Sequence, residues 1–125
     1  MADYTAKHAD DMEAAYEGGF VKVRAELGVS AFGVQIIQLP PEADGYPEHD
    51  HSEDGQEEMY TALGGSGWLD VEGERVDLAP DTFVRVAPGT KRKVFAGTQG
   101  LRMLVVGGTP GQPYELAAAG MLENA

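Results

Sequence analysis

The chain of 125 residues, of which 42% are hydrophobic, has the size of one domain with a buried core. Its 21 Asp and Glu residues against 9 Lys and Arg give a formal charge of −12, which repels nucleic-acid phosphates and anionic membrane surfaces. It has no cysteine, no signal-peptide pattern at the start and no run near the roughly 18 apolar residues of a membrane helix, so we expect a cytoplasmic protein with neither nucleic-acid nor membrane partners.

Helical patterns occur only near the two ends of the sequence, in residues 9–17 and 113–125, and both are short enough to be marginal as isolated helices. Residues 20–27 alternate apolar with charged side chains, the period of two expected of a strand with one buried face. Residues 31–39 predict another strand, which ends at the breaker cluster of residues 40–45.

The second half of the chain also predicts strands. Residues 68–78 indicate a hairpin that turns around Gly73, although Glu-Gly is a weaker turn signal than Asn-Gly. Three more strands follow over residues 82–87, 91–96 and 100–108, separated by glycine-containing turns.

Eight to ten short strands punctuated by 17 Gly and 7 Pro are typical of an all-β sandwich or barrel of antiparallel strands. We therefore divide the chain into a partly helical N-terminal leader over residues 1–18, a barrel over residues 19–108 and a C-terminal tail over residues 109–125.

Residues 47–60, PEHDHSEDGQEEMY, contain the side chains that carry chemistry. His49 and His51 stand at i and i+2, so on an extended segment both imidazoles point to the same face. After six intervening residues comes a carboxylate, Glu58, at the opening of an apolar run. Two histidines and one carboxylate on one face form a set that suits iron(II), manganese, nickel or zinc and leaves positions open for a ligand.

The stretch from Gly45 to Thr90 resembles the cupin superfamily, whose first motif runs Gly, His-x-His, a short loop, Glu, six residues, Gly. Glu58 with Gly65 fits that spacing, and Glu57 with Gly64 fits equally well by counting alone. We prefer Glu58 as the ligand. That register also turns Tyr60 inward and Met59 outward.

The resemblance implies a cupin jelly-roll barrel of two antiparallel sheets with short terminal helical segments. It also implies a homodimer, the common state of small barrels in that family. Trp68 and Phe83 are then expected in the core or at the interface between subunits.

The second motif of the family is degraded in this chain. Arg92 occupies the position of its histidine ligand, and Ala96 that of its asparagine. A guanidinium has no lone pair to donate and therefore cannot coordinate a cation. Three arrangements stay open: Arg92 swings aside from a three-ligand metal, fills the site and pairs with Glu58, or lies one shell out and holds an anionic ligand.

From these residues we predict a small-molecule-binding cupin that holds a divalent metal (Zn, Ni, Mn or Fe) through His49, His51 and Glu58. Arg92 and Tyr60 are expected to bind a small anionic ligand. The first alternative is a metal-free binding or sensing module in which the same side chains form a polar network. The second is a metal-dependent oxygenase or isomerase that uses the ion as a Lewis acid.

Overall fold

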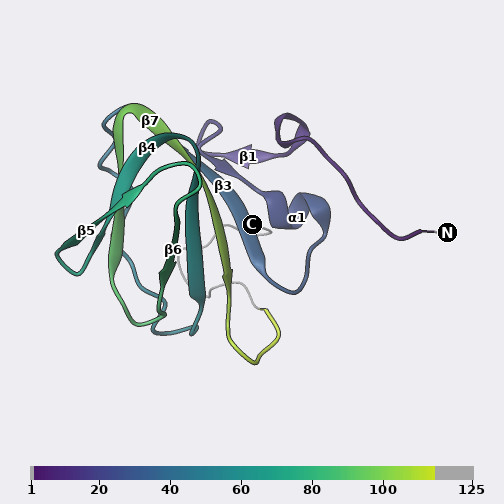
Figure 1. Cartoon of the computed structure of the whole chain (residues 1–125). Helices are drawn as coiled ribbons and strands as arrows, with labels where there is room; N and C mark the ends of the chain where they lie inside the picture. Colours follow the sequence, from purple (N-terminus) through teal and green to yellow (C-terminus); the bar gives the residue numbers. More distant parts are fainter. Residues whose placement is uncertain (1, 115–125) are drawn as a thin grey trace.

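Figure 1 shows the computed structural model, which describes residues 2–114. Strands dominate: within the described part, seven antiparallel strands are hydrogen-bonded in the order β1-β2-β3-β7-β4-β5, and β6 pairs with β4. The elements are η1 (Ala9–Asp11), β1 (Ala14–Ala15), β2 (Phe20–Val21), α1 (Val23–Leu27), β3 (Gly33–Leu39), β4 (Glu57–Val71), β5 (Glu74–Leu78), β6 (Phe83–Val86) and β7 (Arg92–Gly108).

Strands β4 and β7 give the fold its two layers. The first part of β4 pairs with the last part of β7 and with β6, whereas the last part of β4 pairs with the first part of β7 and with β5. The β4–β7 register shifts between Ala62 and Gly64 and again between Gly65 and Gly67. Both strands bend over at the same end of the molecule (Figure 1), so one continuous set of strands encloses an interior.

Glycine is required at this bend. Gly65 has φ +67°, and a Cβ on it would collide with the carbonyl oxygen of Gly100, whose own φ is +81°. A Cβ on Gly67 would likewise collide with the carbonyl oxygen of Phe95. Close backbone approach therefore fixes the bend that the two strands share.

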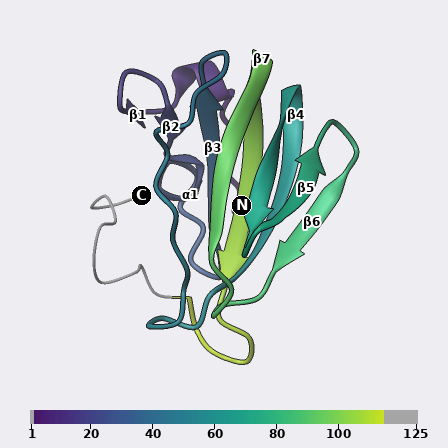
Figure 2. The same cartoon turned by 90° about the vertical axis from the view of Figure 1, so that its left-hand side faces the viewer.

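The core lies between the two layers, and alternate residues of each strand enter it. On β4 these include Tyr60 and Leu69, and on β7 Val94 and Val105, each at most 3% exposed. Figure 2 shows β3, β7 and β4 side by side, with β5 and β6 beyond β4. The period-two pattern thus places every second side chain of the long strands in the barrel interior.

The N-terminal segment differs from the sequence prediction. In place of a helix over residues 9–17 there is one 3-10 turn, η1, followed by β1, whose Ala14 and Ala15 pair with Val21 and Phe20 of β2. A short helix is marginal alone, so backbone pairing with β2, itself joined to β3, determines the conformation. The predicted helix over residues 113–125 lies almost wholly outside the described residues.

The predicted strand over residues 20–27 is only partly correct. Phe20 and Val21 form β2, but Val23–Leu27 form α1, which ends at Gly28 with φ +77°. Gly28 and Val29 both donate backbone hydrogen bonds to the carbonyl of Arg24. Gly28 was the sequence signal against a continuous strand, because glycine commonly caps a helix C-terminus.

The remaining strand predictions agree with the structure. The hairpin between β4 and β5 turns at Glu72 and Gly73, which have φ of +51° and +89°, the left-handed pair that a two-residue hairpin needs. The strands predicted over residues 91–96 and 100–108 are one strand, β7, because the glycines between them bend the chain and do not end its pairing. In the described part of the chain, no helix has the length and apolar character needed to cross a membrane.

Candidate metal centre

Backbone pairing brings the histidine loop to the first residue of β7. His49 and Arg92 exchange two backbone hydrogen bonds of 2.9 Å, and the amide of His51 donates to the carbonyl of Pro88 at 2.7 Å. These bonds hold the loop extended, so both imidazoles enter the barrel beside Glu58 of β4. Residues 43 positions apart in sequence thereby line one site.

His49, His51 and Glu58 come together as the sequence predicts. Nε2 of His49 lies 3.6 Å from Oε1 of Glu58, and Nε2 of His51 lies 3.3 Å from the same oxygen. One ligand atom from each of the three lies within 4.8 Å of the other two. Two ligand atoms at about 2.1 Å from one tetrahedral ion are about 3.4 Å apart, so the spacing fits a divalent metal.

The other ring nitrogen of each histidine contacts an acceptor. Nδ1 of His49 lies 3.3 Å from the Pro47 carbonyl, and Nδ1 of His51 lies 3.0 and 3.1 Å from the two carboxylate oxygens of Asp54. Because both partners only accept, Nδ1 carries the hydrogen, and Nε2 faces Glu58 with either a lone pair or a second proton. A lone pair facing a carboxylate is repulsive, so the arrangement calls for a proton or a metal ion.

Oε1 of Glu58 is the shared acceptor of the cluster. The Tyr60 hydroxyl donates to it at 2.5 Å, and Nη2 of Arg92 lies 3.4 Å away. Burial by itself raises the pKa of Glu58, but its contacts with His49, His51 and Tyr60 hold that pKa well below its usual value. Its contact with Glu58 raises the pKa of His51, although burial opposes this.

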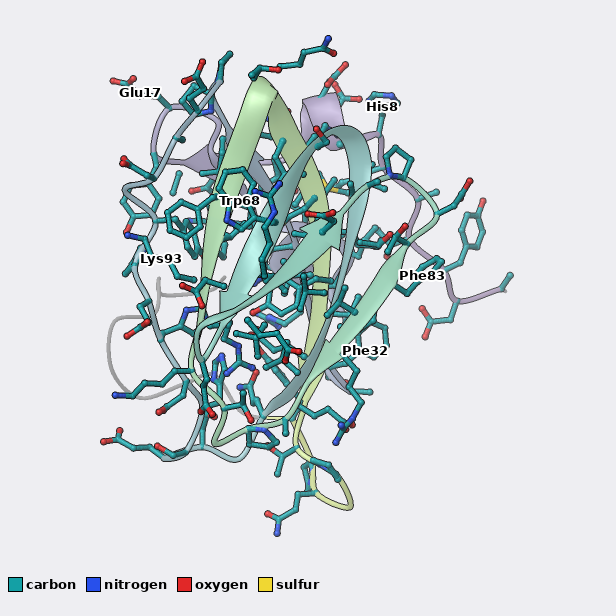
Figure 3. The ribbon with its side chains drawn as sticks, turned by 60° about the vertical axis from the view of Figure 1, so that its left-hand side comes forward. His8, Glu17, Phe32, Trp68, Phe83 and Lys93 are labelled. Atoms are coloured by element: carbon teal, nitrogen blue, oxygen red, sulfur yellow. The ribbon has the colours of Figure 1, made fainter. Side chains whose placement is uncertain are left out.

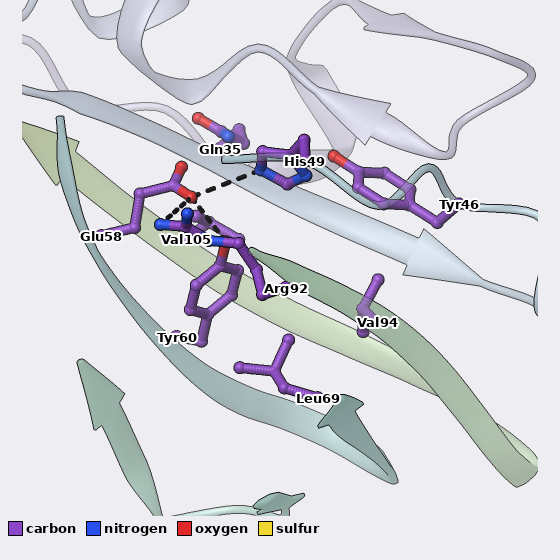
Figure 4. Close-up of a pocket in the computed structure, with 9 residues that line it drawn as sticks. All are labelled: Gln35, Tyr46, His49, Glu58, Tyr60, Leu69, Arg92, Val94 and Val105. Carbon is purple, nitrogen blue, oxygen red and sulfur yellow. Dashed lines mark hydrogen bonds and ion pairs between the residues drawn. The ribbon is translucent and has the colours of Figure 1, made fainter. Parts of the chain in front are cut away.

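The guanidinium of Arg92 is fixed in place and is only 1% exposed. Its Nε donates to the Tyr60 hydroxyl at 3.3 Å, and its Nη1 donates to the Thr90 carbonyl at 2.6 Å. Its Nη2 is buried and makes no hydrogen bond with a described residue, nor does Nε2 of His51. Figure 4 shows the arginine directed at Glu58, as in the arrangement in which it pairs with that carboxylate.

Tyr60 keeps its proton in this setting. Burial, and then the adjacent carboxylate of Glu58, raise the pKa of Tyr60 well above its usual value. The phenol therefore stays neutral and acts as a hydrogen-bond donor.

The structure decides between the two candidate glutamates. Glu58 is buried at the centre of the cluster, whereas the side chain of Glu57 lies on the outer face and pairs with the exposed Arg85. Met59 also turns outward and Tyr60 inward, which is the register preferred from the sequence.

A cavity of about 10 Å³ adjoins the cluster, enough for roughly one water-sized group. Its nine lining residues come from β3, β4, β7 and the histidine loop, and all are drawn in Figure 4: Gln35, Tyr46, His49, Glu58, Tyr60, Leu69, Arg92, Val94 and Val105. A whole substrate does not fit in this space, so a ligand would insert one group and remain at the mouth.

Sequence reasoning missed Gln35 and Tyr46. Gln35 shares the inward face of β3 with Ile37, and a polar residue on the buried face of a predicted strand was a signal that pointed to it. Tyr46 lies edge-on to His49, with ring centroids 6.4 Å apart, and only its place just before the histidine motif hinted at a role.

Residues 35–107 match the family described as Cupin domain, which is more than half of the chain, and the protein belongs to that family. The match spans β3 to β7 and includes all three members of the histidine–carboxylate group. None of the curated proteins compared matches this chain.

Solved structures agree with the fold. A cupin protein from Bacteroides fragilis is 23% identical, with a TM-score of 0.74, over 98% of this chain and 99% of that one. KdgF from Halomonas sp. is 13% identical, with a TM-score of 0.66, over 93% of this chain and 96% of that one. A cupin-superfamily sugar phosphate isomerase from Silicibacter pomeroyi is 19% identical, with a TM-score of 0.64, over 82% of this chain and 74% of that one.

Proposed function

We propose that this cupin binds a divalent metal through His49, His51 and Glu58 and uses that centre to bind a small anionic molecule. Zinc, nickel, manganese and iron(II) all accept two imidazoles and one carboxylate. When bound, such an ion supplies a Lewis acid with open positions for an oxygen ligand. Arg92 is the partner for the negative charge of that ligand, and the neutral Tyr60 holds Glu58 and Arg92 in position.

The observation that carries this proposal is Nε2 of His51. It is buried, makes no hydrogen bond with a described residue, and lies in a group of three ligand atoms of metal-site dimensions. An imidazole nitrogen in such a position is costly unless it carries a proton toward Glu58 or binds a metal ion. The carboxylate of Asp54 on its Nδ1 is the kind of outer partner that orients a metal-bound histidine.

The proposed anionic ligand is supported by the second buried atom without a hydrogen bond, Nη2 of Arg92, which borders the same cavity. The sugar phosphate isomerase among the similar structures also fits an oxygen-rich anion as the ligand class.

The ion pair of Arg92 with Glu58 favours one rival, a metal-free module. In that case the guanidinium and a protonated His51 supply the positive charge that Glu58 requires.

Elemental analysis of purified protein, joined to titration of the apo protein with zinc, nickel and manganese, separates the two. We expect one ion per chain in the parent and none after His49→Ala, with Glu53→Gln, an exposed carboxylate of the same loop, unchanged. If the parent binds no ion under either measurement, the metal-free module is correct.

We also propose that two copies associate through the outer face of β4 and β6. Phe83 and Leu63 are 67% and 45% exposed there, and Phe32, which is 42% exposed, lines an open hollow of about 520 Å³. Figure 3 labels the two phenylalanines. The hollow also contains the pair of Glu57 with Arg85. A two-fold axis lets each of these charges face its opposite across the interface, which suits a second copy of the same chain.

Sedimentation equilibrium tests this association. We expect a dimer for the parent and a monomer for Phe83→Ser, while Tyr16→Ser, which removes an aromatic side chain that is 73% exposed elsewhere, should stay dimeric. A monomeric parent at tens of micromolar would rule the dimer out.

A further inference from the structure

The wall of the cavity contains two polar side chains that the metal centre does not use. The side-chain amide of Gln35 and the hydroxyl of Tyr46 both line it, and neither makes a hydrogen bond with a described residue. They lie on either side of His49 in the view of Figure 4. Both residues are half-buried, so they have lost part of their hydration without gaining a hydrogen-bond partner among the described residues.

Their position marks the mouth of the site. The side chain of His49 is 33% exposed, whereas those of His51, Glu58 and Arg92 are at most 9% exposed. His49 is thus the most exposed of these four side chains, and Gln35 and Tyr46 line the cavity with it.

The size of the inner space limits which group of the ligand can enter it. The inner space takes roughly one water-sized group. A carboxylate is flat and has two oxygens, whereas the phosphate of an ester is tetrahedral and has three free oxygens, so the carboxylate is the smaller anion to bring an oxygen into this space. Nη2 of Arg92, which makes no hydrogen bond with a described residue, is suited to such an oxygen.

The chemistry of the mouth limits the next atom of the ligand. An amide offers two donors and one acceptor, and the hydroxyl of Tyr46 donates or accepts. Burial, with a smaller effect of Glu58, raises the pKa of Tyr46 to about 12, so that phenol is neutral. Neutral hydrogen-bond donors and acceptors beside the carboxylate position suit an uncharged oxygen substituent on the ligand.

We propose that Gln35 and Tyr46 recognise a hydroxyl group next to the carboxylate, so that the ligand is a small 2-hydroxycarboxylate. This inference rests on the proposed function for the place of the carboxylate, at the metal and Arg92. The preference for the hydroxyl belongs to Gln35 and Tyr46, and it is measured separately from metal binding.

The probes are glycolate and acetate, which differ by one hydroxyl, titrated calorimetrically into the cobalt-loaded protein. Because glycolate can also chelate the metal, the decisive quantity is the change in glycolate affinity in two variants. Tyr46→Phe removes only the hydroxyl, and Gln35→Met keeps the side-chain length. We expect each variant to weaken glycolate binding about fivefold, the effect of one lost hydrogen bond, and to leave acetate within about twofold.

Two matched controls are Tyr4→Phe and Gln99→Leu, both at exposed positions away from the cavity, which should leave both affinities unchanged. Equal weakening of glycolate and acetate, or no change of either, would overturn the inference. Tighter binding of inorganic phosphate than of glycolate would overturn the ligand class.

Titration with cobalt alone separates a failure of the proposed metal centre from a failure of the role of Gln35 and Tyr46. If neither cobalt nor zinc, nickel or manganese binds, the proposed metal centre fails, and the same two probes are then titrated into the metal-free protein. A glycolate preference that Tyr46→Phe abolishes there would uphold the role of the mouth, and its absence would reject it.

Discussion

The two walls of the barrel interior contribute opposite charges to the same cluster. The histidine loop and β4 contribute two imidazoles and the carboxylate of Glu58, which together suit a cation. Strand β7 contributes the buried guanidinium of Arg92, which suits an anion. A fixed cation therefore lies beside the group of side chains that could hold a metal ion.

The charged groups of the two walls are also held in place by different contacts. Glu58 accepts from Tyr60 on its own strand, while Arg92 is tied to Tyr60 and to the Thr90 carbonyl. Tyr60 therefore connects the two walls, because its neutral hydroxyl donates to the carboxylate and accepts from the guanidinium without adding charge.

The largest expected effect comes from Glu58→Gln, which removes the carboxylate that contacts both walls. Arg92 is then a buried cation without its partner, so we expect the free energy of unfolding to fall by about 3 to 5 kcal/mol and metal binding to be lost. Urea denaturation followed by the fluorescence of Trp68 measures the first, and metal titration the second.

The matched control is Glu57→Gln on the outer face of the same strand. Its surface pair with Arg85 contributes at most about 1 kcal/mol, and it contacts no histidine. Equal losses for the two glutamates would contradict the assignment of the central role to Glu58.

Asp54→Asn tests the support of the metal wall. The amide is a weaker acceptor for Nδ1–H of His51, so we expect metal affinity to fall about 10- to 100-fold with a small change in stability. Isothermal titration of apo protein measures this, with Glu53→Gln as the control. An affinity within a factor of two of the parent would mean that Asp54 does not orient His51.

Arg92→His tests the other wall. Removal of the fixed positive charge should raise metal affinity about tenfold or more, because like charges at close range repel and an imidazole can coordinate. The same change should weaken capture of a carboxylate on the metal-loaded protein, since its charged partner is gone. If anion affinity does not fall, Arg92 fills space beside the metal and is not an anion partner.

The smallest expected effect is the pH dependence of the metal-free protein. The raised pKa of His51 stabilises the fold below its usual value of 6.5, and this contribution is lost as the pH rises through the raised pKa. The lowered pKa of Glu58 stabilises the fold above its usual value of 4.5 and is lost as the pH falls through the lowered pKa.

Stability of the metal-free protein should therefore be greatest between pH 4.5 and 6.5 and decline above that window. Urea denaturation at a series of pH values measures it. Saturating metal should remove the decline above pH 6.5, because the ion replaces the proton on His51. A decline that persists with metal bound would show that another group controls it.

The sequence by itself determined the parts of this protein that depend on short spacing. The period-two patterns predicted β3, the hairpin of β4 with β5, and β6, because alternation of side chains along a strand is a local property. The i, i+2 histidines and the spacing from Glu58 to Gly65 predicted the three candidate ligands for the same reason.

Tertiary structure alone decided the parts that depend on distant pairing. β1 forms because Ala14 and Ala15 find partners on β2, and the single strand β7 continues across its glycines because β4 bends with it. Gln35 reaches the cavity, and Arg92 pairs with His49, only because the barrel brings those strands together. Local spacing specifies which face a side chain occupies, while hydrogen bonds between residues far apart in the sequence determine what it meets there.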